Sequence, residues 1–224
     1  EDGDGNGHNT AVGFQSQTAA TTGEYNTSLG SQSMGTGATS GDHNIAIGYN
    51  AGAAITTSSR NTLVGGLAGD AITTGEENIA IGYYALSTED GNGYNTAVGT
   101  YALTALNAGA SGFNTAIGYY TGYWMTTGVQ NTLLGAYAGD NLTTGSYNVA
   151  VGYHALGTED GHGGNTAIGY LALNALNAGV DAYNVAVGYN AGVALTSGIK
   201  NTLIGGDAGD ALTIGNFNVA LGYH

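Results

Sequence analysis

The chain has 224 residues, of which 42 are Gly, none is Pro or Cys, and only 8% are charged. Two basic residues against 16 acidic ones give a net charge of −14, which makes nucleic acid and anionic membrane surfaces poor partners, because their binding depends on Lys and Arg. No apolar run approaches the roughly 18 residues that span a bilayer, and without Cys there is no disulfide framework.

The chain opens on an acidic segment, residues 1–7, in which Asp2, Asp4 and Asn6 alternate with Gly. Oxygen ligands at alternate positions with Gly between them are typical of calcium loops, so these three residues are a candidate calcium site. A complete EF-hand is excluded, because no bidentate Glu follows at the right distance. The alternative interpretation is a solvated acidic turn.

From Asn9 onward a six-residue motif fills the chain: Asn, a β-branched residue, usually Ala, a large aliphatic, Gly, then usually an aromatic. We number these positions one to six. The motif occurs 13 times at intervals of 17 to 19 residues, which is the mark of a repeat architecture. Its Asn residues are at 9, 26, 44, 61, 78, 95, 114, 131, 148, 165, 184, 201 and 218.

Alternation of β-branched and small residues predicts a short strand in each repeat, and the Gly, Thr, Ser and Asn between strands predict turns. A 17-residue unit is too short for a helix with a strand, so we predict an all-β fold, a β-solenoid of about 13 coils, each with two or three short strands. The aliphatic at position four is expected to form the inner stack. The Asn residues are expected to form an amide ladder along the stack or to bond turn backbone.

Two further features suggest close packing around the motif. The Gly at position five needs a positive φ or admits another backbone at close range, and the neighbouring Ala favours a second chain as that backbone. Position three is Leu only at Leu63, Leu133 and Leu203, where position six is Gly or Ala instead of an aromatic. This predicts an exchange of volume between positions three and six.

A longer period of 70 residues lies above the short one, since Asn44, Asn114 and Asn184 begin nearly identical sets of coils. Residues 1–224 therefore read as a single repeat rod, either an excerpt of a longer chain or a filament subunit that stacks end to end. Each set repeats the same acidic turns, which are weaker candidate metal sites than the first segment. Their residues are Asp70, Glu89, Asp90, Asp140, Glu159, Asp160 and Asp210. For the Asp that follows Ala-Gly, a turn cap is the favoured interpretation.

The remaining polar and aromatic residues point to structure more than to chemistry. The five His residues show no spacing typical of zinc ligands. The Tyr residues at position six, such as Tyr119 and Tyr170, are interpreted as an aromatic ladder, with a sugar-binding stripe as the alternative. No nucleophile motif or phosphate loop is present, so no catalytic residue is predicted and the protein is expected not to be an enzyme.

Residues 44–48 (Asn-Ile-Ala-Ile-Gly) and 184–188 (Asn-Val-Ala-Val-Gly) resemble the Asn-Ser-Val-Ala-Ile-Gly motif of trimeric autotransporter adhesin heads. The whole unit, as in residues 131–148, is similar to repeats of phage-type tail-fibre proteins and related secreted fibre proteins. The resemblance covers nearly the whole chain, although the adhesin repeat is shorter. It implies a left-handed stacked β-roll, three chains wide, that serves as a surface-exposed rod.

The sequence therefore predicts a structural fibre or adhesin rod, outside the cell, at the cell surface or on a virion. Its expected partner is itself, as a homotrimer or filament, with a cell-surface or polysaccharide receptor as a further partner. Calcium is the only cofactor that the sequence suggests. Two alternatives stay open. One is an ice-binding solenoid, based on the Thr at position two, which Ile and Val interrupt in five coils. The other is a tailspike-like protein that binds or degrades polysaccharide, which would need two carboxylates across a groove.

Overall fold

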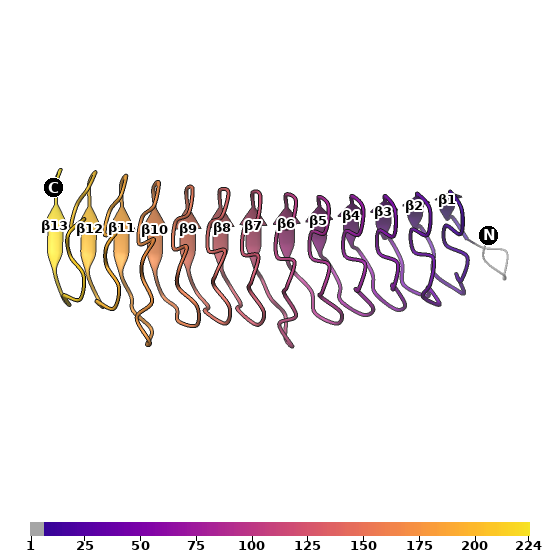
Figure 1. Ribbon diagram of the computed structural model, residues 1–224. Helices are drawn as coiled ribbons and strands as arrows, with labels where there is room; N and C mark the ends of the chain where they lie inside the picture. Colours follow the sequence, from indigo (N-terminus) through magenta and orange to yellow (C-terminus); the bar gives the residue numbers. More distant parts are fainter. Residues whose placement is uncertain (1–6) are drawn as a thin grey trace. The chain divides into compact units, whose positions relative to one another are not determined.

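A computed structural model describes residues 7–224, and its packing divides the chain into two compact units, Glu1–Phe113 and Asn114–His224. Each unit is a β-solenoid in which successive coils stack and each coil contributes one strand (Figure 1). The first unit holds β1 (Thr10–Val12), β2 (Thr27–Leu29), β3 (Ile45–Ile47), β4 (Thr62–Val64), β5 (Ile79–Ile81) and β6 (Thr96–Val98). The second holds β7 (Thr115–Ile117), β8 (Thr132–Leu134), β9 (Val149–Val151), β10 (Thr166–Ile168), β11 (Val185–Val187), β12 (Thr202–Ile204) and β13 (Val219–Leu221).

The predicted all-β solenoid is confirmed, but the expected number of strands per coil is wrong. Each coil has one strand of three residues, paired in parallel and in register with the next, as in Thr62↔Ile79. Turns form the rest of the coil and still bond from coil to coil, for example from the Leu67 amide to the Tyr49 carbonyl at 2.8 Å. No helix able to cross a membrane is found among residues 7–224.

The strand faces are reversed relative to our prediction. The Ala at position three is the inward residue, and Ala46, Ala80 and Ala150 are fully buried. The aliphatic at position four points outward, as does the residue at position two, so the predicted inner stack of position-four side chains is wrong. The interior is filled instead from the turns, by larger side chains such as Ile55 and Leu86, which leaves room for only a methyl group from most strands.

The predicted exchange between positions three and six is also wrong, because position three is inside and position six lies on the surface. The fully buried Leu63 is matched instead by glycines at position nine of its own and the preceding coil. A Cβ added at Gly52 or Gly69 would lie 2.8 Å from a Leu63 methyl carbon. Where position three is Ala in β5 and β6, position nine is Leu86 or Leu103. The core therefore conserves volume between positions three and nine.

The Gly at position five has a positive φ and also has another stretch of backbone close to it. All 13 have φ between +125° and +146°, which L side chains rarely adopt. A Cβ at Gly13 would lie 2.4 Å from the carbonyl oxygen of Gly30. The close backbone is thus the next coil of the same chain, and the expected second chain at this position is wrong.

The predicted amide ladder is confirmed in both units. The Asn61 amide nitrogen donates to the Asn44 Oδ1 at 3.0 Å, and the Asn61 Nδ2 donates to the same oxygen at 3.1 Å. The Asn61 Nδ2 also reaches the Gly75 carbonyl at 3.0 Å. These buried side chains bond both the next Asn and the turn backbone, so each coil is fixed to its neighbour in one register.

Candidate functional site

The acidic turns contain a carboxylate that belongs to the core. Glu89 and Glu159 are fully buried at position twelve, which is Ile, Leu or Met in most other coils. The Oε1 of Glu89 accepts hydrogen bonds from the Asn92 amide at 3.0 Å and from its Nδ2 at 2.9 Å. The Oε2 atoms of both glutamates are buried without a hydrogen-bond partner. These side chains are therefore not part of a solvated turn.

Burial is the dominant influence on these carboxyls. It raises the pKa of Glu89 above its usual range, and the hydrogen bonds from Asn92 oppose the change. It likewise raises the pKa of Glu159, where His162 favours the charged form. Ionisation of either carboxyl therefore lowers the free energy of unfolding of the chain.

The other predicted site residues are not gathered with these glutamates. Asp2, Asp4 and Asn6 lie outside the described residues. Asp70 and Asp140 are half-buried, each with an Oδ1 that makes no hydrogen bond, and burial raises the pKa of both. The Asp140 Oδ1 lies 3.6 Å from the His154 Nδ1. This imidazole favours the charged form of Asp140 and so opposes the effect of burial on the pKa of the carboxyl. Asp210 is half-exposed in the last complete turn of the second unit.

Within residues 7–224, three metal-ligating side chains come together at only one place, Glu159, Asp160 and His162. One ligand atom from each lies within 4.8 Å of the others. The His162 Nδ1 is 3.2 Å from the Glu159 Oε1 and 4.0 Å from the Asp160 Oδ1. Carboxylate oxygens with an imidazole nitrogen suit zinc-like cations better than calcium, which takes oxygen ligands.

Sequence spacing missed His162, because our interpretation treated the His residues as scattered. A signal was available in the 70-residue period. The turn reads Glu89-Asp90-Gly91-Asn92 in the first unit and Glu-Asp-Gly-His at residues 159–162 in the second. In this repeated acidic turn, His162 thus replaces the Asn92 of the first unit.

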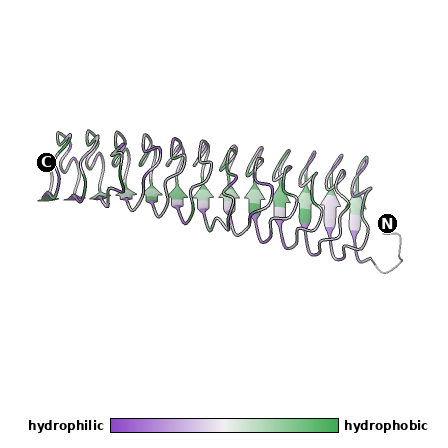
Figure 2. Ribbon diagram, turned by 90° about the horizontal axis from the view of Figure 1, so that it is seen from below, coloured by the Kyte–Doolittle hydropathy of each residue, from purple (hydrophilic) through white to green (hydrophobic). Residues whose placement is uncertain are grey.

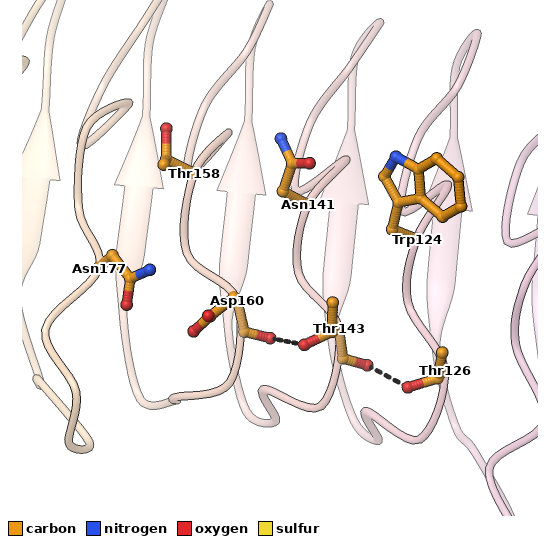
Figure 3. Close-up of a pocket in the computed structure, with 7 residues that line it drawn as sticks. All are labelled: Trp124, Thr126, Asn141, Thr143, Thr158, Asp160 and Asn177. Atoms are coloured by element: carbon orange, nitrogen blue, oxygen red, sulfur yellow. Dashed lines mark hydrogen bonds between the residues drawn. The ribbon is translucent and has the colours of Figure 1, made fainter.

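A groove of about 550 Å³ crosses four successive coils of the second unit. Turn residues line it, and none of them belongs to a strand (Figure 3). They are Trp124, Thr126, Asn141, Thr143, Thr158, Asp160 and Asn177. The volume lies within the range of small-molecule sites, and the lining is mostly polar, with Trp124 as its one large aromatic side chain.

Hydrogen bonds along the coils fix the floor of this groove. The Thr126 hydroxyl donates to the Thr143 carbonyl at 3.1 Å, and the Thr143 hydroxyl donates to the Asp160 carbonyl. The Asn141 Nδ2 donates to the Gly157 carbonyl at 2.7 Å. Because these donors are held by backbone, the polar groups have defined orientations before any ligand is bound.

Our sequence interpretation also missed Trp124, although it is the only Trp of the chain. Its counterpart 70 residues earlier is Ala54, and the counterpart of Asn141 is Ala71. The other five groove positions are identical in the first unit, at Thr56, Thr73, Thr88, Asp90 and Asn107. A repeat whose exposed turn gains a Trp and an Asn at neighbouring coils is the signal that could have found the groove.

Three Tyr residues at position six, in consecutive coils of the second unit, form part of the predicted aromatic ladder on the surface. Tyr153 and Tyr170 stack with centroids 5.5 Å apart, and Tyr170 and Tyr189 follow at 5.2 Å. A second stack joins His8, Tyr25 and His43 at 4.9 and 5.0 Å. Stacking between coils explains these rings without a ligand.

Comparison of the chain with protein-family models, curated proteins and solved structures found no match.

Proposed function

We propose that this protein is a non-enzymatic structural rod that self-associates side by side and serves as an extracellular fibre or adhesin stalk. The observation that carries the proposal is the outer row, which we define as the side chains at positions two and four of the 13 strands. Apart from eight Thr, the row consists of Val, Ile and Leu, and it holds no charged residue. Most strands are coloured as hydrophobic in Figure 2.

The outer row is exposed although its residues are apolar. Ile81 is 38% exposed and Ile117 41% exposed. Leu29, Ile45, Ile79, Ile168 and Ile204 are also exposed. Exposed aliphatic side chains that recur along the strands of each unit are characteristic of a protein–protein interface. Because each aliphatic is already about half buried, covering it would contribute about 1 kcal/mol, roughly half the value for full burial.

A second copy of this chain is the partner that fits the outer row best. Both copies carry the same row with a spacing of about 4.8 Å between strands, so their side chains can interdigitate in a constant register. The net charge of −14 opposes contacts between the acidic surfaces of two copies. Contact through the outer row avoids this repulsion, because the row contains no carboxylate. The resemblance to adhesin heads favours three chains.

Charged substitutions in the outer row test this proposal. The double variant Ile81→Lys, Ile168→Lys should sediment as a monomer at concentrations where the unchanged chain is oligomeric, because association would bury Lys side chains against one another. The matched control is Thr57→Lys with Thr127→Lys, which adds the same charge at exposed turn positions. Circular dichroism checks folding. Association that survives the first pair, or is lost equally with the second, would contradict the proposal.

A further inference from the structure

We propose that the groove of the second unit binds a neutral oligosaccharide, with a sugar ring stacked on Trp124. This goes beyond the structural role above, and the two are independent, because the groove is formed by turns and the outer row by strands. The proposal rests on the indole, the polar groups beside it, the charge of the groove and the difference between the two units.

The indole offers an exposed, supported platform. Trp124 is 55% exposed, while its ring is held edge-to-face against Tyr123 with centroids 4.7 Å apart and an interplanar angle of 79°. Its backbone amide donates to the Asp140 carbonyl at 2.9 Å. The electron-rich face of an aromatic ring attracts the weakly positive C–H groups on the apolar face of a pyranose. A fixed indole in a polar groove therefore selects a ring that is apolar on its face and polar at its edge.

The polar groups of the groove suit the edge of a sugar. With Nδ2 occupied by the Gly157 carbonyl, the Asn141 Oδ1 is presented as an acceptor on the side of Trp124 (Figure 3). Farther along, the Asp160 carboxylate and the Asn177 amide point toward the space between their coils. Acceptors and donors are thus interspersed, as sugar hydroxyls require, since each hydroxyl both donates and accepts. Four coils extend about 14 Å at a strand spacing of about 4.8 Å, which accommodates a short oligosaccharide.

Charge excludes anionic ligands from the groove. Asp160 is the one charged residue that lines the groove, and the chain as a whole carries −14. An anionic sugar, phosphate or nucleic acid would bring its negative charge against this carboxylate with no Lys or Arg in the lining to compensate. A neutral sugar can donate hydroxyl hydrogens to Asp160, which is a charge-assisted interaction.

The first unit provides an internal reference. It has the same Thr hydroxyl chain, from Thr56 to the Thr73 carbonyl at 2.9 Å and from Thr73 to the Asp90 carbonyl at 2.8 Å. It has Ala at the positions of Tyr123, Trp124 and Asn141, namely Ala53, Ala54 and Ala71. The frame is shared, and the second unit alone carries the side chains suited to a sugar ring.

Because Trp124 is the only Trp, its fluorescence reports on the groove directly. Neutral tetrasaccharides of β-linked glucose, β-linked N-acetylglucosamine and α-linked mannose would be titrated against the full chain, in EDTA so that no cation mediates binding. We expect a saturable change in Trp124 emission with at least one of them, and none with oligogalacturonate at the same concentrations. Absence of a saturable change with every neutral probe, or equal binding of the acidic one, would overturn the proposal.

Variants then assign the binding to the groove by calorimetry. Trp124→Ala should weaken binding at least about tenfold, and Asn141→Ala should weaken it less. In the Trp124→Ala, Asn141→Ala background, the substitutions Ala53→Tyr, Ala54→Trp and Ala71→Asn should restore binding in the first unit. Unchanged affinity of Trp124→Ala would place the binding elsewhere and overturn the proposal. Failure of the folded transplant to bind would contradict the assignment to these three side chains.

Discussion

The two units share an interior and differ in the turns. Several inner residues recur with the same burial 70 residues apart, whereas the substitutions that create the groove and the metal-ligating cluster fall on exposed or half-exposed turn positions. The conserved pairs include Leu63 and Leu133, Gly69 and Gly139, and Glu89 and Glu159. The changed pairs include Ala54 and Trp124, Ala71 and Asn141, and Asn92 and His162. The solenoid thus separates packing, which every coil must satisfy, from recognition, which single turns can acquire.

Truncation of the inner Leu should affect both units alike and should have the largest effect. Leu63→Ala and Leu133→Ala each leave a cavity beside glycines that cannot fill it, so each should lower the free energy of unfolding by about 2–5 kcal/mol. Urea unfolding followed by circular dichroism measures the loss, with Thr127→Ala as a surface control. A clearly smaller effect in one unit would show that the interior is not shared.

Neutralising the buried glutamates should stabilise both units at neutral pH. Burial raises the folded-state pKa of Glu89 and Glu159 above the ordinary value of 4.5, so the stability they provide is complete below that pH and is lost as pH rises through the folded pKa. Glu89→Gln and Glu159→Gln should each raise the free energy of unfolding at pH 7, and the gain should vanish below pH 4.5. A gain in the free energy of unfolding that is larger in acid than at pH 7 would contradict the raised pKa of these glutamates.

Zinc should stabilise the turn at residues 159–162 but not the turn at residues 89–92, and the change in stability should be smaller than in the preceding tests. Zinc at ten times its dissociation constant should stabilise the unchanged chain by about 1.4 kcal/mol. The Glu159 Oε1 lies 3.2 Å from the His162 Nδ1, and the buried Oε2 of the same carboxylate has no hydrogen-bond partner. The measurement is thermal unfolding with zinc, calcium or EDTA. His162→Asn should abolish the zinc effect, and Asn92→His should add a second one. Stabilisation by calcium that survives His162→Asn would instead favour the oxygen-only site predicted from the sequence.

The sequence was sufficient for the architecture but not for the direction of its side chains. The period and the Asn ladder followed from repetition, since residues that recur in every coil must stack. Alternation in a three-residue strand separates two faces without saying which is inside, and hydrophobicity wrongly favoured the aliphatic at position four over Ala. Glu89 looked like a surface residue because only stacking reveals that its position is Ile55 or Leu106 in other coils. The groove needed three-dimensional placement, because its residues are spread over more than 50 positions of the chain.

The central claim is that the outer row is covered by a second copy of the chain. The absence of Cys allows a direct test with a single introduced thiol, Ile117→Cys in the outer row, and Thr127→Cys on an exposed turn as its control. Treatment with a short bifunctional maleimide should link chains of 22.2 kDa into dimers through the first thiol and not through the second. Equal cross-linking of the two, or none through Ile117→Cys, would contradict the account.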